Sequence, residues 1–130
     1  MTNKLNSKKT IVIVDDDDDL LSILRFVLQN ELFKVITFSN GSDAIEHFQN
    51  TDFLSQCSLI ILDRVLKDLD GLEIAKIIGK QKHKPPIIFL SVLSTENEIQ
   101  KGIEMGATMY ICKPFNIKIF LDLVKKTISS

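Results

Sequence analysis

Short apolar runs alternate with helical patterns along most of this chain. The runs are rich in Val, Ile and Leu at successive positions, which is typical of strands buried on both faces. They predict strands at residues 10–14, 34–38, 58–62, 87–90 and 108–112. Between the runs, apolar side chains recur every three or four positions, which predicts helices that each bury one face. These helices are expected at residues 20–28, 42 to about 50, 72 to about 79, 96–104 and 117–128.

The residue types at the expected helix ends agree with this pattern. Thr95 followed by Glu98 resembles a capping box, and Asn116 can cap the last helix. Gly106 is well placed to close the fourth helix in the left-handed backbone conformation. Apolar strands that alternate with helices predict an α/β fold with a parallel sheet covered on each side. In open sheets of this kind, ligands bind beyond the carboxyl ends of the strands.

Composition limits the classes of protein that fit. The chain has 130 residues, 45% of them hydrophobic, so residues 10–130 are expected to form one domain after a disordered extension, residues 1–9. A formal net charge of -1 argues against direct binding to nucleic acid or to a membrane. The polar N-terminus is unlike a secretory signal, and Cys57 and Cys112 suit reduced core thiols, so a cytoplasmic location is expected.

The residues that follow the expected strands are chemically coherent. Asp15 and Asp16 follow the first strand, Asp63 the third, Ser91 the fourth and Lys113 the fifth. Crowded carboxylates repel one another, and a hard cation such as Mg²⁺ relieves this repulsion. A carboxylate can also attack phosphorus and form an acyl phosphate. The acidic run continues with Asp17, Asp18 and Asp19. These three residues suit the start of a helix, where the partial positive charge of the helix favours carboxylates.

Several motifs in order resemble the receiver domains of two-component response regulators. They are Ile-Val-Ile-Val before Asp15 and Asp16, Leu-Ile-Ile-Leu before Asp63 with Gly71 after it, Pro86-Ile-Ile-Phe-Leu-Ser91, and Tyr110-Ile-Cys-Lys113-Pro114. The resemblance covers nearly the whole chain, from about residue 10 to residue 128. It implies a flavodoxin-like (βα)5 fold, which is a three-layer sandwich around a five-stranded parallel sheet of order 2-1-3-4-5.

The resemblance also implies a role for each residue of the site. Asp63 would be the phosphoacceptor, Lys113 and Ser91 would contact the phosphoryl group, and Tyr110 would turn inward as Ser91 moves. Mg²⁺ would be held by Asp15, Asp16, Asp63 and the backbone carbonyl of Val65. The peptide bond between Lys113 and Pro114 would be cis.

The implied function is signalling, with no turnover of a small-molecule substrate beyond assistance to the domain's own phosphorylation and dephosphorylation. The donor would be a phosphohistidine on a histidine kinase or histidine phosphotransfer protein. The changed surface would be the fourth helix, fifth strand and fifth helix of the family, here Glu96–Glu104, Met109 and the last helix. It would contact a downstream output protein or domain. A homodimer stays open, although Thr108, Met109 and Leu123 lack the charged pattern of relatives that dimerise through this face.

The chain departs from the family pattern at four positions. Lys67 replaces the usual proline, and Val92 replaces a small residue after the switch hydroxyl. Val65 and Leu93, which flank the site, are apolar, and we therefore expect poor ordering of an attacking water and a long-lived phosphoryl state. Two other functions are considered: a haloacid-dehalogenase-like phosphotransferase, whose nucleophile lies after the first strand, and a degenerate receiver that only binds proteins.

Overall fold

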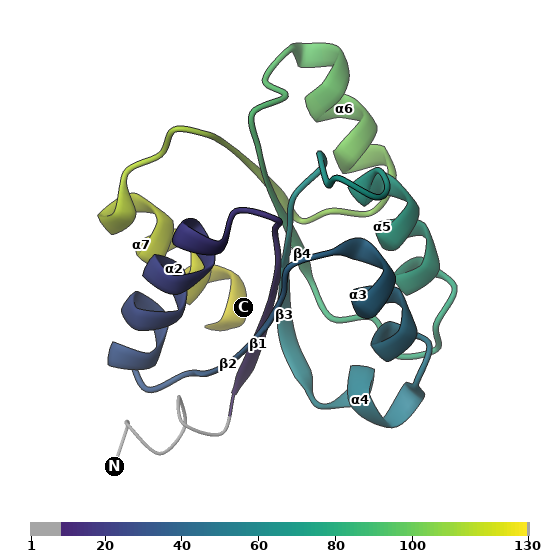
Figure 1. The fold of residues 1–130 in the computed structure, drawn as a ribbon, viewed down its shortest axis with the longest axis horizontal. Coiled ribbons are helices and arrows are strands. Elements are labelled where there is room, and N and C mark those ends of the chain that lie inside the picture. Colours follow the sequence, from purple (N-terminus) through teal and green to yellow (C-terminus); the bar gives the residue numbers. More distant parts are fainter. Residues whose placement is uncertain (1–8, 130) are drawn as a thin grey trace.

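Five parallel strands form one sheet at the centre of the molecule (Figure 1). The computed structural model describes residues 9–129, so the expected extension at residues 1–9 lies almost entirely outside the described residues. The sheet has the order β2-β1-β3-β4-β5, as expected. Its strands are β1 (Thr10–Val14), β2 (Lys34–Phe38), β3 (Cys57–Leu62), β4 (Ile87–Ser91) and β5 (Met109–Cys112).

Helices cover both faces of this sheet, which makes the three layers of a flavodoxin-like fold (Figure 1). The helices α2 (Asp18–Asn30) and α7 (Ile117–Ser129) lie side by side on one face. The other face carries α3 (Gly41–Phe48), α4 (Thr51–Ser55), α5 (Gly71–Gly79) and α6 (Glu96–Glu104). None of the helices in the described range is long and apolar enough to cross a membrane.

The alternation of side chains along each central strand divides the core into two layers. Ile11 and Ile13 of β1 pack with the apolar faces of α2 and α7, whereas Val12 and Val14 pack with α3, α4 and α5. All four side chains are fully buried. Because successive residues of a strand point to opposite faces, an uninterrupted apolar run serves both layers at once.

The predicted caps of the helices are largely confirmed. The side chain of Asp17 accepts a hydrogen bond from the backbone N–H of Leu20 and caps α2, and Asn116 caps α7 in the same way at Ile119. Thr95 accepts from the N–H of Glu98 at the start of α6, which is the first half of the expected capping box. The second half is not formed, because the carboxylate of Glu98 pairs with Arg64 and Lys101 instead. Gly106 follows α6 with a φ of 105°.

The sequence prediction missed the short helix α4. Residues 42 to about 50 were expected to form one helix, but α3 ends at Phe48 and the separate helix α4 follows, capped by Asn50.

The last helix has a broad apolar face that is only partly buried. Its side chain Leu123 packs against the core, whereas Ile119 is 59% exposed.

Candidate functional site

The carboxyl ends of β1 and β3 bring two aspartates together. The strands pair in parallel register, with Val14 opposite Leu62, so Asp15 and Asp63 both leave the sheet at the same edge. The N–H of Asp63 donates a 3.0 Å hydrogen bond to the carbonyl of Val14. The strand pairing thus fixes the backbone directly beneath both carboxylates.

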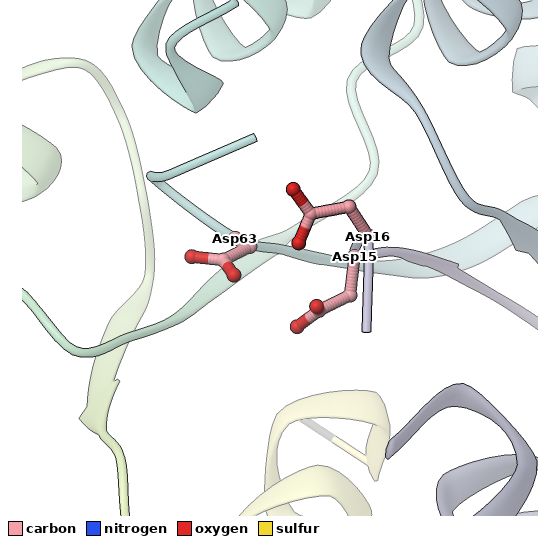
Figure 2. Close-up of side chains that lie close together, drawn as sticks. All are labelled: Asp15, Asp16 and Asp63. Carbon is pink, nitrogen blue, oxygen red and sulfur yellow. The ribbon is translucent and has the colours of Figure 1, made fainter. Parts of the chain in front are cut away.

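Three carboxylates form an acidic cluster at this edge (Figure 2). Asp15, Asp16 and Asp63 each place one carboxylate oxygen within 4.8 Å of the others. Asp15 and Asp63 are 1% and 5% exposed, and Asp16 is partly exposed. One oxygen of Asp15 accepts from the N–H of Asp17, and one oxygen of Asp63 accepts from the N–H of Val65. These backbone hydrogen bonds orient two of the three carboxylates.

Lys113 supplies the positive charge of the site. Its Nζ lies 2.7 Å from Oδ2 of Asp15 and 3.0 Å from Oδ2 of Asp63. Burial lowers the pKa of Lys113, but the hydrogen bonds to Asp15 and Asp63 outweigh burial and raise this pKa overall. The pKa of Asp15 is also raised, because burial and the charge of Asp63 outweigh the bond from Lys113. Lys113 is therefore charged, and the peptide bond that links it to Pro114 is cis, as expected.

The donor set of the acidic cluster fits a hard divalent cation. Three carboxylates face one ammonium group, and two of the three are nearly removed from water. Such a set leaves uncompensated negative charge, which oxygen-binding cations such as Mg²⁺ neutralise. The backbone of Val65 lies beside this cluster, since its N–H donates to Asp63.

Ser91 and Tyr110 meet at the segment that follows β4. The hydroxyl of Ser91 is fully buried and accepts a hydrogen bond from the N–H of Leu93. Tyr110 donates a 2.6 Å hydrogen bond to the carbonyl of the same Leu93. Burial raises the pKa of Tyr110, although nearby Ser91 and Arg64 act in the opposite direction. The backbone N–H of Lys113 donates to the carbonyl of Ser91, which ties these residues to the acidic site.

The loop after Asp63 is held at both ends. A Cβ at Gly71 would lie 2.1 Å from the backbone oxygen of Asp63, so α5 can begin this close to the end of β3 only because Gly71 lacks a side chain. The carboxylate of Asp68 accepts from the N–H groups of Gly41 and Ser42 at the start of α3, which lowers its pKa. Asp68 therefore anchors the loop in which Lys67 replaces the usual proline.

Arg64 is the site residue that the sequence did not reveal. It follows Asp63 directly, yet it is only 3% exposed. Its guanidinium donates to Asp70 Oδ1, to the backbone carbonyl of Glu98 and to Glu98 Oε1, at 3.3, 3.0 and 3.0 Å. In the sequence Arg64 looks like an ordinary polar loop residue, because its partner Glu98 on α6 lies 34 positions away.

This fold and this site define a phospho-accepting α/β signalling domain, and comparisons with known proteins agree. Residues 11–125 match the family described as the response regulator receiver domain. The chain belongs to this family of two-component signalling domains, whose general function is to accept a phosphoryl group on an aspartate.

Individual relatives support the assignment. The alkaline phosphatase synthesis transcriptional regulatory protein PhoP of Bacillus subtilis is 34% identical over 108 residues, which is 83% of this chain. The non-phosphorylated receiver domain of HemR from Leptospira biflexa is 30% identical, with a TM-score of 0.87, and the two chains cover 95% and 96% of each other. The BeF₃-activated receiver domain of DrrB, from Thermotoga maritima, is 33% identical, with a TM-score of 0.82 and coverage of 94% and 98%.

The curated relative is much longer than this chain. The matched part spans 43% of the length of PhoP. The similarity to PhoP therefore concerns the receiver domain, and the transcriptional role in its name concerns that whole protein.

Proposed function

We propose that Asp63 is the phosphoacceptor of this receiver domain. The observation that carries the proposal is the position of Asp63, whose carboxylate lies within 4.8 Å of Asp15 and Asp16 and 3.0 Å from the ammonium of Lys113. Asp63 therefore lies between two carboxylates that could help it to bind a cation and the ammonium group of Lys113. Phosphoryl transfer depends mainly on positioning and on neutralising the phosphoryl oxygens, and this arrangement suits both needs.

The residues that would hold Mg²⁺ are Asp15, Asp16, Asp63 and the backbone carbonyl of Val65. When bound there, Mg²⁺ would supply positive charge to offset the carboxylates and the phosphoryl oxygens. Burial, together with the charge of Asp63, raises the pKa of Asp15 despite the hydrogen bond from Lys113, and a bound cation would offset both effects. Binding of the cation to this site would be saturable, and the oxygen ligands would favour hard cations such as Mg²⁺.

The reaction of this chain's own residues starts from an ionised Asp63. A carboxylate oxygen of Asp63 attacks phosphorus, and the bond between phosphorus and the donor's imidazole nitrogen breaks. The bonding electrons stay on that nitrogen, which then takes a proton, and Asp63 becomes an acyl phosphate. Lys113 pairs with one phosphoryl oxygen, and Ser91 donates its hydroxyl hydrogen to another. Attack of water on phosphorus later releases inorganic phosphate and restores the carboxylate.

The readout surface in this proposal comprises α6, β5 and α7. Exposed apolar side chains lie on it, including Ile103 at 40% and Ile119 at 59%. We propose that a histidine kinase or histidine phosphotransfer protein supplies the phosphoryl group in the cytoplasm. A downstream output protein or domain reads the changed surface, and self-association through it is an alternative form of output.

Intact-mass spectrometry after incubation with acetyl phosphate tests the proposal. The wild type should gain one phosphoryl group only when Mg²⁺ is present, and Asp63→Asn should gain none. Asp122→Asn is the matched control, since Asp122 is an exposed aspartate on α7, and it should behave as the wild type. No gain in the folded wild type at saturating Mg²⁺ would favour a degenerate receiver that only binds proteins.

A further inference from the structure

The side chain of Arg64 joins two helices to the residue beside the phosphoacceptor. Its Nε donates to Asp70, which caps α5, and its two terminal nitrogens donate to the backbone and side chain of Glu98 in the first turn of α6. All three guanidinium nitrogens are therefore in use. The planar guanidinium fixes the direction of each bond, so it holds α6 in one place relative to the loop.

The backbone of Arg64 is equally constrained. Its carbonyl accepts a 2.8 Å hydrogen bond from the N–H of Gly71. The next residue, Val65, donates its N–H to the carboxylate of Asp63 itself. A new group on that carboxylate changes the charge and shape of the acceptor that holds Val65, and Arg64 lies between the two residues.

The same helix also contacts the switch tyrosine. The ring of Tyr110 packs against Gly102, where an added Cβ would lie 2.9 Å from Tyr110 Cδ2. Glu98 and Gly102 are four residues apart on α6, so they lie one turn apart on the same side of the helix. Arg64 is hydrogen-bonded to α6 at Glu98, and Tyr110 packs against α6 one turn later, at Gly102.

We propose that Arg64 is a coupling residue that transmits phosphorylation of Asp63 to α6 and thereby sets the position of Tyr110. The proposal rests on the proposed function, because it assumes that Asp63 takes the phosphoryl group. The loop after Asp63 moves when the carboxylate is modified, Arg64 carries this movement to Glu98, and α6 shifts over the tyrosine ring. Arg64 itself touches neither the phosphoryl group nor the acidic cluster in this scheme.

The chain contains a built-in reporter of this movement. It has one tyrosine and no tryptophan, so its intrinsic emission comes from Tyr110 alone. Quenching of this emission by acrylamide measures how far the tyrosine ring is accessible. Beryllofluoride with Mg²⁺ serves as the phosphoryl probe, with acetyl phosphate as a second donor, and occupancy is measured separately by ¹⁹F NMR and intact mass.

The experiment compares the wild type with Arg64→Met, Arg64→Lys and Glu98→Gln. At equal occupancy of Asp63, Arg64→Met should lose at least half of the wild-type change in quenching, and Arg64→Lys should recover part of it. Glu98→Gln keeps the shape and the hydrogen-bond acceptor but removes the charge, so it should give an intermediate response. Because Glu98 acts through Arg64, adding Glu98→Gln to Arg64→Met should cause no further loss.

The outcomes separate this proposal from the proposed function. A full wild-type quenching response in Arg64→Met at equal occupancy overturns the coupling role, and so does a wild type whose tyrosine does not respond to full occupancy. If Arg64→Met fails to fold, Glu98→Gln decides the same question, with a wild-type response counting against the proposal. Absence of occupancy in the wild type would instead overturn the assignment of Asp63.

Discussion

Tyr110 donates its hydroxyl hydrogen to the backbone carbonyl of Leu93 over 2.6 Å, and Leu93 in turn donates its N–H to Ser91. The tyrosine and the buried hydroxyl therefore share one backbone residue as their common partner. Any movement of Ser91 toward a phosphoryl group must disturb the hydrogen bond that the N–H of Leu93 donates to the Ser91 hydroxyl. The geometry links the two proposed switch residues through the chain as well as through space.

Gly102 allows the tyrosine to lie under α6. A Cβ there would approach Tyr110 and Phe89 to 2.9 and 3.0 Å. We expect Gly102→Ala to lower the free energy of unfolding by about 1 kcal/mol, because overpacking of about 1–3 kcal/mol exceeds the gain of about 1 kcal/mol in helix propensity. Urea unfolding measures the loss, and acrylamide quenching should show a more accessible Tyr110.

Gly79→Ala is the matched control for this substitution. Gly79 ends α5, and a Cβ there would meet nothing within 4 Å. The alanine should therefore raise the free energy of unfolding by roughly 0.4–1 kcal/mol through the unfolded chain. If Gly102→Ala were as stabilising as Gly79→Ala, the close packing of Tyr110 against α6 would be wrong.

A methyl group at Gly71 should be far more damaging than one at Gly102. It would overlap the backbone oxygen of Asp63 at 2.1 Å, and backbone atoms cannot move aside as a flexible side chain can. Gly71→Ala should cost about 3 kcal/mol in urea unfolding, the upper end for overpacking. Where the variant still folds, phosphorylation by acetyl phosphate should be strongly reduced, and normal phosphorylation would contradict the close approach.

Much of this site could be predicted from the sequence because strand ends converge by topology. Once the strands at Asp15, Asp63 and Ser91 were assigned, a parallel sheet required them to meet at one edge. The separation of 50 residues between Asp63 and Lys113 did not matter for the same reason. The metal site and the roles of individual residues remain predictions.

The features that the sequence concealed depend on side chains and on very short elements. The helix α4 spans only Thr51–Ser55, which is too short to show a helical repeat. Arg64 and Asp68 looked like ordinary polar loop residues. Their partners, Glu98 and the start of α3, lie 34 and about 27 positions away, and no local pattern encodes such pairs.

We expect Lys113 to compete with a bound cation for the same carboxylate oxygens. Its ammonium contacts both Asp15 and Asp63. Lys113→Met should therefore tighten Mg²⁺ binding by at least about fivefold, because even in bulk water two unit charges roughly 4 Å apart interact by about 1 kcal/mol. Isothermal titration calorimetry measures the affinity, with Lys118→Met on α7 as the control of equal charge. Weaker binding by Lys113→Met would contradict competition.

The two cysteines should react at very different rates. Burial raises the pKa of Cys57 to about 11, and the side chain is 5% exposed, whereas Cys112 is only partly buried. At pH 8, a thiol with this pKa is ionised in about one molecule per thousand, and the thiolate is the reactive form. The native protein should release about one equivalent of thionitrobenzoate quickly from Ellman's reagent, and Cys112→Ser should remove this phase. Reaction of Cys57 should accelerate as the pH rises toward 11. A fast phase that survives in Cys112→Ser would show that burial does not protect Cys57.

The lifetime of the phosphorylated form should depend on two apolar side chains beside the site. Val65 and Leu93 line the same surface hollow of about 210 Å³, and Val65 is 46% exposed. Neither side chain can hold a water molecule by hydrogen bonding, so hydrolysis should be slow. Val65→Asn adds an amide that can orient the attacking water, and we expect the half-life of the acyl phosphate to fall by about threefold to tenfold.

The decay of the phosphorylated mass after removal of acetyl phosphate measures this half-life. Ile119→Asn, an equally polar change at an exposed position on α7, should leave the decay unchanged, and an unaltered half-life in Val65→Asn would place control of hydrolysis elsewhere.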